Sequence, residues 1–167
     1  MILRCDSKGD KRFSALFARV GPQSIEDWYQ GAKRNGNGYK YKKPKGERAV
    51  FFLLDATYVP AITIQFDYYL MLWHAYFKKH KDLLEYAATF QGFQDVFDGH
   101  QGVIYTPSAA YPQADRCCQA EAIAHLVYLY VNKQKKHYPK ILSHVWRVLL
   151  NESNYEEVND KNESEAV

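Results

Sequence analysis

A carboxylate, an amide and an amine near the N-terminus are spaced in a way that suits chemistry. Glu26, Gln30 and Lys33 lie at i, i+4 and i+7, so a continuous helix would place them on one narrow stripe. A lysine desolvated among aromatic rings loses its proton more readily and can attack a sugar C1′ to form an imine. A glutamate on the same face can shuttle a proton to the leaving base. These residue types suit glycosidic-bond cleavage, but from spacing alone a solvated helix face is the simpler interpretation.

The segment that carries these residues has the signals of a helix that begins at Ser24. Ser24 followed by Asp27 is typical of a capping box, in which a hydroxyl and a carboxylate satisfy the first turn. The run Asn35-Gly36-Asn37-Gly38 suits left-handed caps and turns and predicts the end of the helix near residue 34. A broad apolar sector would anchor the helix in a core, and it comprises Ile25, Trp28, Tyr29 and Ala32.

A glycine- and lysine-rich loop follows the predicted helix over residues 35–46. Tyrosines alternate with lysines in it, a pattern that can hold phosphate groups while a ring stacks on a base. A mobile, solvated loop is the alternative interpretation. The candidate ligand-binding residues of this part of the chain are Tyr39, Tyr41, Lys43, Lys45 and Arg48.

The elements that must position these residues are predicted from the apolar pattern along the chain. An edge strand is expected at 1–3, and 13–20 is either a short strand or a single helical turn. Residues 49–54 are a buried strand or a short buried helix, and 55–60 is expected to be a turn. Alternation over 62–66 is strand-like but leads into a helix. Helices are expected at about 67–79, 82–90, 113–132 and 138–150, and residues 93–98 alternate between apolar and polar.

Composition indicates one domain with a sizeable core. The chain has 167 residues, of which 47% are hydrophobic and 16% aromatic, and the domain is expected to span 1–150. Residues 151–167 lack a core pattern and are expected to be an acidic, disordered tail. The net charge of +3 is concentrated in one basic patch, which argues against a general nucleic-acid binder. With no signal peptide pattern and no apolar run near 20 residues, a cytoplasmic protein without a membrane segment is expected.

Common catalytic and metal-binding motifs are missing from the sequence. It has no dinucleotide fingerprint, phosphate-binding P-loop or nucleophile elbow, no C-x-x-C pair and no two-histidine zinc spacing, so neither a cofactor nor a metal is predicted. Cys117 opens a predicted helix, where the dipole lowers a thiol pKa, but no histidine lies nearby in sequence to complete a dyad. The acids of the second half are the other candidates for catalysis: Asp95, Asp98, Asp115 and Glu121.

Two segments resemble the NADAR family, the NAD- and ADP-ribose-associated N-glycosidases. Residues 13–17 read Phe-Ser-Ala-Leu-Phe where the family has Phe-Ser-Asn-Phe. Residues 24–33 read Ser-Ile-Glu-Asp-Trp-Tyr-Gln-Gly-Ala-Lys where it has Thr/Ser-x-Glu-His-Tyr-Tyr/Phe-Gln-Ala-x-Lys. A weaker likeness covers 76–89. The chain departs from the family at Asp27, where histidine is usual, and in 111–123, which replaces a Trp-Gly-x-Gly…Asn-x-Leu-Gly segment.

The resemblance implies a compact, predominantly helical α+β fold and hydrolysis of an N-glycosidic bond to a ribose phosphate or ADP-ribose. Carried over by position, Glu26 would be the acid/base, Lys33 the imine-forming nucleophile and Gln30 a substrate orienter. Asp115 is the third catalytic candidate, in the segment that departs from the family. The further substrate-binding candidates are Phe13, Ser14, Tyr29, Tyr111 and Gln119.

Three hypotheses of function therefore stand. The leading one is an N-glycosidase acting on a ribosylated base or nucleotide, either free or within a nucleic acid. The second is a non-catalytic nucleotide or nucleic-acid binding module that uses the basic loop. The third is a helical protein-interaction module that uses exposed aromatic residues. The sequence does not define the base, the oligomeric state or the openness of the cleft.

Overall fold

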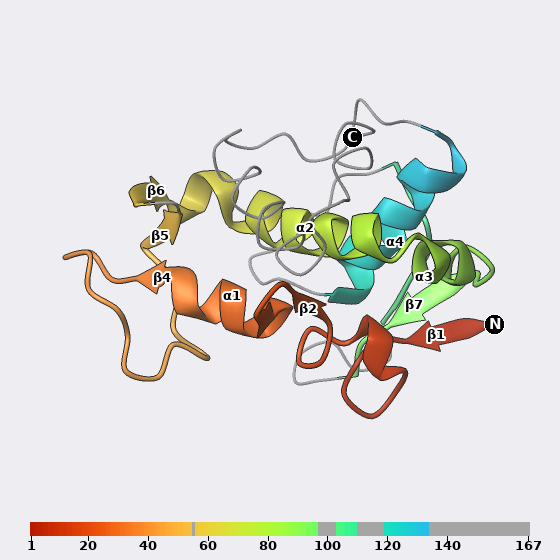
Figure 1. Ribbon diagram of the computed structural model, residues 1–167, viewed down its shortest axis with the longest axis horizontal. Helices are drawn as coiled ribbons and strands as arrows, with labels where there is room; N and C mark the ends of the chain where they lie inside the picture. The colour runs from red at the N-terminus through yellow and green to blue at the C-terminus, as the bar shows by residue number, and fades with distance from the viewer. Residues whose placement is uncertain (55, 97–102, 110–118, 134–167) are drawn as a thin grey trace.

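The fold is α+β, with short strands and helices arranged around one long helix, α2 (Ala61–Lys79) (Figure 1). Helices contribute more of the described residues than strands do. The α+β prediction is confirmed, whereas the expected helix at 138–150 and the expected tail lie outside the described residues. The structure, a computed structural model, describes residues 1–54, 56–96, 103–109 and 119–133.

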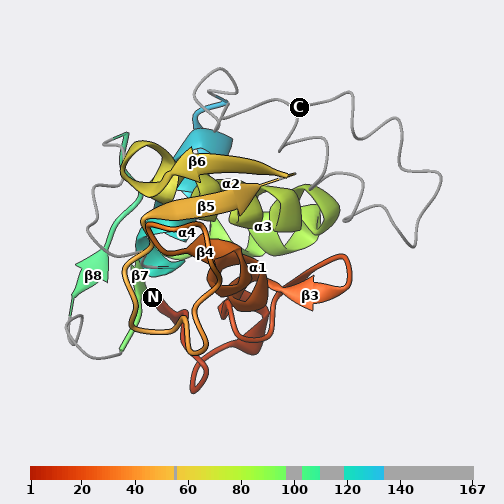
Figure 2. The same cartoon turned by 90° about the vertical axis from the view of Figure 1, so that its left-hand side faces the viewer.

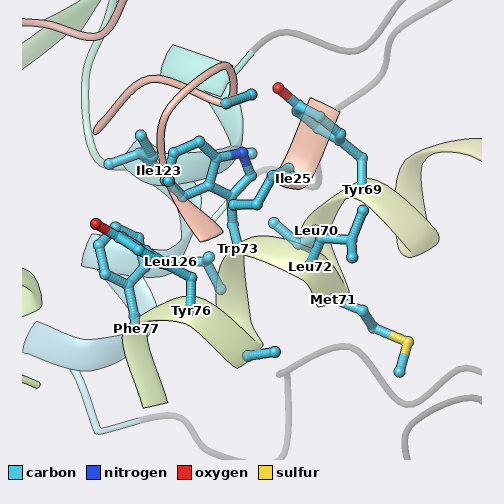
Figure 3. Close-up of a cluster of buried hydrophobic side chains, with 14 of the residues drawn as sticks. Ile25, Tyr69, Leu70, Met71, Leu72, Trp73, Tyr76, Phe77, Ile123 and Leu126 are labelled. Carbon is cyan, nitrogen blue, oxygen red and sulfur yellow. The ribbon is translucent and has the colours of Figure 1, made fainter. Parts of the chain in front are cut away.

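Helix α2 is the centre of the core. Every residue from Tyr68 to Phe77 is buried, because this stretch is apolar on all sides and other elements must surround it. Figure 3 shows the fully buried Trp73 in a cluster with Ile25 and Ile123. The helix begins at Ala61, so the strand-like alternation over 62–66 belongs to its first turns. No helix within the described residues is both long and apolar enough to cross a membrane.

A three-stranded sheet joins the N-terminus to the middle of the chain. Strand β1 (Ile2–Arg4) pairs in parallel with β7 (Gly92–Gln94), and β8 (Ile104–Tyr105) pairs antiparallel with β7. The prediction of an N-terminal edge strand is confirmed. Because Arg4 stands opposite Gln94, the residues that follow β1 and β7 leave the sheet at the same edge. A Cβ at Gly92 would lie 2.7 Å from the Ile104 side chain and 2.8 Å from that of Ile2, so a larger residue there would have to displace both side chains.

A second sheet has the order β4–β5–β6, and its strands lie side by side next to α1 in Figure 2. The ambiguous run 49–54 contains a strand, β5 (Phe51–Leu54), which pairs with β4 (Lys33–Arg34) and β6 (Thr57–Pro60). The prediction of a turn over 55–60 is wrong for most of that segment. Ala56 adopts a positive φ of 63°, so the reversal takes few residues and β6 begins directly after it.

Helix α1 (Ile25–Ala32) follows a β-hairpin in which a two-residue turn joins β2 (Arg19–Val20) to β3 (Gln23–Ser24). The Ser24 hydroxyl accepts a hydrogen bond from the Asp27 amide at 3.0 Å, which confirms the hydroxyl half of the predicted capping box. The remaining described helices are the 3₁₀ turn η1 (Lys11–Phe13), α3 (Lys81–Ala87) and α4 (Gln119–Val131).

Helix α1 is shorter than the sequence predicts. It ends at Ala32, and Lys33 turns to extended backbone (φ −65°, ψ 136°) because it pairs with Phe52 of β5. The expectation of one helical stripe through Glu26, Gln30 and Lys33 is therefore wrong. The competing interaction, a strand pairing with a distant segment, leaves no trace in the local periodicity.

Removal of the α1 cap tests how far this helix depends on Ser24. We expect Ser24→Ala to lower the free energy of unfolding by about 1 kcal/mol, because the Asp27 amide loses its buried acceptor. Ser24→Thr keeps a hydroxyl and serves as the control. Chemical denaturation measures both variants, and equal stability of Ser24→Ala and the unmodified protein would contradict the role of the cap.

Candidate functional site

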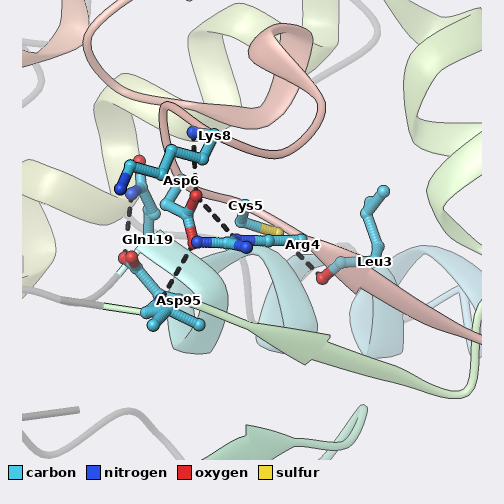
Figure 4. A network of polar contacts seen from close by, with 8 residues as sticks. Leu3, Arg4, Cys5, Asp6, Lys8, Asp95 and Gln119 are labelled. Carbon is cyan, nitrogen blue, oxygen red and sulfur yellow. Dashed lines mark hydrogen bonds and ion pairs between the residues drawn. The ribbon is translucent and has the colours of Figure 1, made fainter. Parts of the chain in front are cut away.

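The Asp95 carboxyl is buried and only half satisfied. Asp95 follows β7 directly and is 2% exposed. Its Oδ2 accepts a hydrogen bond from Gln119 Nε2 at 2.8 Å, while Oδ1 has no hydrogen-bond partner among the described residues (Figure 4). The pKa of Asp95 is raised to about 6, mainly by burial and also by the negative charges of Asp6 and Glu26, which together outweigh the lowering effects of the Gln119 bond and of Arg4. A carboxyl in this state can hold a proton near neutral pH.

Gln119, the first residue of α4, connects Asp95 to the N-terminal part of the chain. Its Oε1 accepts a hydrogen bond from the Ala15 amide at 2.6 Å, and its Nε2 donates to Asp95. The sequence predicts substrate binding for Gln119. Because both ends of its amide already contact protein groups, the arrangement instead suits positioning of Asp95.

The segment from Ser14 to Ala18 lies across the start of α1 and brings Glu26 to the same region. The Ala15 carbonyl accepts from the Glu26 amide and the Ala18 carbonyl from the Ile25 amide, both at 2.9 Å. Ser14 is 1% exposed, and its Oγ has no hydrogen-bond partner among the described residues. Loop, helix and Asp95 thus form one connected set of polar groups.

Asp6 lies at the same sheet edge as Asp95, but its surroundings favour the ionised carboxylate and not the protonated carboxyl. Its carboxylate accepts hydrogen bonds from Arg4 Nε at 2.6 Å, from the Lys8 amide at 2.9 Å and from the Val96 amide at 3.0 Å (Figure 4). Burial opposes ionisation, but these donors together outweigh it and lower the pKa of Asp6. Two neighbouring carboxyls whose pKa values are pushed apart are a common arrangement in acid–base active sites.

Lys33 lies at the other end of α1 and holds the basic loop. It is 7% exposed, and its Nζ donates to the Glu47 carbonyl at 2.9 Å and to the Pro44 carbonyl at 3.3 Å. The ammonium also lies 5.4 Å from the centroid of the Tyr29 ring. The structure therefore holds the Lys33 ammonium against the backbone of the basic loop instead of on a helical stripe shared with Glu26.

The other predicted residues of α1 and its surroundings are mostly packed in the core. Tyr29 is 6% exposed, with its ring 5.2 Å from that of Phe52, and Phe13 is fully buried with its ring 6.1 Å from that of Phe77. Both rings are inaccessible to a ligand in this conformation. Gln30 is half-buried, and its Oε1 has no hydrogen-bond partner among the described residues.

The basic loop is held by hydrogen bonds between side chains and backbone, and its cationic side chains are exposed. The Tyr41 hydroxyl donates to the Arg48 carbonyl at 2.9 Å, and the Asn35 side chain accepts from the amides of Asn37 and Tyr39. Tyr39 is 69% exposed. Lys43, Lys45 and Arg48 are also exposed, and none of them forms an ion pair within the described part of the chain.

Three candidates, Asp98, Asp115 and Tyr111, lie outside the described residues. Asp95, by contrast, is only one of several acids that the second half of the sequence offers. The sequence signal for Asp95 is its position in the apolar–polar alternation of residues 93–98, which begins in β7. The burial of its carboxyl depends on contacts with distant segments, so no local pattern shows it. Within residues 1–54, 56–96, 103–109 and 119–133, no group of three or more His, Cys, Asp or Glu side chains can hold a metal ion.

Comparison with protein-family models, with curated proteins and with solved structures gives no match to this chain. Membership of the NADAR family therefore stays a prediction from the two sequence segments. What the chain can do chemically follows from the geometry of the described residues.

The buried Asp95 makes stability depend on pH in a predictable direction. Its pKa is higher in the folded protein than in the unfolded chain, so the folded state loses stability as the pH rises from about 4 to about 7. We expect Asp95→Asn, which can still accept from Gln119, to raise the free energy of unfolding by about 1–3 kcal/mol at pH 8 and to have no such effect at pH 4.

Urea denaturation at several pH values measures this difference. Asp82→Asn removes an exposed carboxylate of α3 and serves as the control, for which no such gain is expected. A stability difference for Asp95→Asn that is the same at pH 4 and pH 8 would show that the carboxyl is not destabilised by burial.

Proposed function

We propose that the protein hydrolyses the N-glycosidic bond of a ribosylated base or nucleotide, with Asp95 as the general acid and Glu26 as the second carboxylate. The observation that carries the proposal is the buried Asp95 carboxyl, which has one oxygen without a hydrogen-bond partner among the described residues and lies within electrostatic reach of Glu26. Glycosidic hydrolysis commonly uses such a pair, one group giving a proton to the leaving group and the other supporting the cationic sugar centre.

The chemical step follows from these two groups. As the C1′–N bond breaks, its electron pair leaves with the base nitrogen, which takes the proton of Asp95. Glu26 supports the oxocarbenium-like centre at C1′. The oxygen of a water molecule then bonds to C1′, and the water proton returns to Asp95. With a pKa of about 6, roughly a tenth of Asp95 carries its proton at pH 7, enough for a general acid at neutral pH.

Two other buried polar atoms, one in the loop before α1 and one in α1 itself, support binding of a polar ligand. Ser14 Oγ and Gln30 Oε1 resemble Asp95 Oδ1 in having no hydrogen-bond partner among the described residues. A buried polar group without a partner costs about 1–3 kcal/mol, so such groups favour a ligand that supplies donors and acceptors. Gln30 follows Glu26 by one turn of α1 and shares its side of the helix. Ribose hydroxyl groups have suitable chemistry for these atoms.

The contacts of Lys33 favour a different role from the imine-forming nucleophile implied by the family resemblance. Its Nζ donates to two carbonyls of the basic loop, so attack on a sugar would require it to release that loop. We therefore assign Lys33 to positioning the loop, and catalysis to the carboxyl pair. The imine route is a separate hypothesis that a trapping experiment distinguishes.

A non-catalytic binding module is the second candidate, and the exposed cations of the basic loop favour it. Lys43, Lys45 and Arg48 are free of ion pairs within the described residues and follow the exposed Tyr39 closely in the sequence, a combination that suits phosphates and a stacked base. A thermal-shift and cleavage screen with ADP-ribose, NAD, ribosylated guanine and free nucleotides separates the candidates. Binding without turnover would support the module.

Substitution of the carboxyl pair tests the proposed mechanism. With a substrate from that screen, we expect Asp95→Asn and Glu26→Gln each to lower kcat by a factor of about 10²–10⁴, because each removes an acid–base or charge-stabilising group. Asp27→Asn changes the exposed neighbouring acid of α1 and is the matched control, for which near-normal kcat is expected. Normal kcat in Asp95→Asn would exclude Asp95 as the acid.

Borohydride trapping tests the role of Lys33. We expect no covalent adduct at Lys33 during turnover, because its ammonium is engaged with the Pro44 and Glu47 carbonyls. Lys33→Met should retain measurable cleavage while weakening substrate binding through a loosened loop. A trapped Lys33 adduct, together with complete loss of turnover in Lys33→Met, would replace the carboxyl mechanism with the imine route.

A further inference from the structure

The orientation of the Gln119 amide is determined by its neighbours. The Ala15 backbone N–H can only donate, so the Gln119 atom 2.6 Å away must be the carbonyl oxygen Oε1. The other end of the amide is then the NH₂ group, which faces Asp95 Oδ2 at 2.8 Å. A flipped amide would place two donors against each other at Ala15, so the backbone contact selects this orientation.

This orientation also selects the oxygen of Asp95 that can carry a proton. The Gln119 NH₂ group has no acceptor capacity, so Asp95 Oδ2 must accept in both the neutral and the ionised state. The proton of the neutral carboxyl is left to Oδ1, the oxygen without a hydrogen-bond partner among the described residues.

We propose that Gln119 is a positioning residue that fixes the proton of Asp95 on Oδ1, the atom from which it passes to the leaving base. The inference rests on the proposed function only for the destination of the proton. The contacts of Gln119 with Ala15 and Asp95 place the proton on Oδ1 in any reaction in which Asp95 acts as an acid. The geometry thus links a loop amide to the protonation of a carboxyl that lies far along the chain.

The charged groups around Asp95 are consistent with this assignment. From the N-terminal segment, Asp6 raises the Asp95 pKa and Arg4 lowers it, and from α1 the Glu26 charge raises it. Asp6 is engaged with Arg4, Lys8 and Val96 and does not bond to Asp95. Gln119 is therefore the polar side chain that distinguishes the two Asp95 oxygens within the described part of the chain.

The titration of Asp95, followed by ¹³C NMR of its carboxyl carbon, tests the inference without a substrate. The Asp95 signal is assigned by its loss in Asp95→Asn. We expect Gln119→Leu to raise the Asp95 pKa from about 6 to about 7 or above, because burial persists while the bond that stabilises the charged form is lost. Gln91→Leu, which changes an exposed glutamine four residues before Asp95, should leave the titration unchanged.

Gln119→Glu provides the second variant, in case Gln119→Leu does not fold. It keeps an acceptor for the Ala15 amide but presents an oxygen to Asp95 Oδ2, so the two carboxyls must share a proton. One of them should then titrate well above pH 6. An unchanged Asp95 titration in a folded Gln119 variant would overturn the inference.

Activity separates failure of this inference from failure of the proposed function. If a substrate is cleaved, Gln119→Leu should lower kcat with little change in KM and move the pH profile with the Asp95 pKa, whereas loss of a purely structural contact would leave that profile in place. If no N-glycoside is cleaved but the Asp95 titration moves as expected, the proposed function fails and the role of Gln119 stands. Cleavage with an unmoved titration would support the proposed function and overturn the role of Gln119.

Discussion

The burial of α2 is the constraint on which the rest of the structure depends. A helix that is apolar on all sides from Tyr68 to Phe77 cannot face water, so α1, α3, α4, β2 and β6 must all pack against it. Helix α4 additionally packs on β7 and β8. Helices α1 and α4, which carry Glu26 and Gln119, therefore meet because both cover α2, and α4 in turn packs on β7, which Asp95 follows. The candidate site is a product of that convergence, because its three residues come from α1, from the end of β7 and from the start of α4.

Asp6 and Asp95 show how hydrogen-bond donors decide the charge of a buried carboxyl. The two residues follow adjacent parallel strands and leave the sheet at the same edge, where ligands commonly bind in sheets with parallel strands. Asp6 is surrounded by one guanidinium and two backbone amides, whereas Asp95 receives a single donor from Gln119. Burial acts on both, but only Asp95 lacks enough donors to offset it. The pair thus supplies a fixed negative charge beside a group that can exchange a proton.

The displacement of Lys33 from the predicted stripe has a clear physical cause. Local periodicity predicts a helix well where the backbone hydrogen bonds stay within that helix. The apolar sector and the Ser24 cap of α1 were predicted in this way. Strand pairing with Phe52 ends the helix at Ala32, and the carbonyls of Pro44 and Glu47 capture the Lys33 ammonium. These partners lie far enough along the chain that no short-range pattern contains them.

The sequence by itself determined the N-terminal edge strand, the Ser24 cap of α1 and the apolar core of α2, because these depend on residue type and on spacing within one element. The α+β class, in contrast, was expected only from the family resemblance. The sequence also contained Glu26, Gln119 and Asp95 as candidates without indicating that they belong together. Only the tertiary structure decided their grouping, through contacts between residues 104 and 24 positions apart in the chain. The raised pKa of Asp95 likewise belongs to the folded state, since burial is a property of the three-dimensional surroundings and not of the residue.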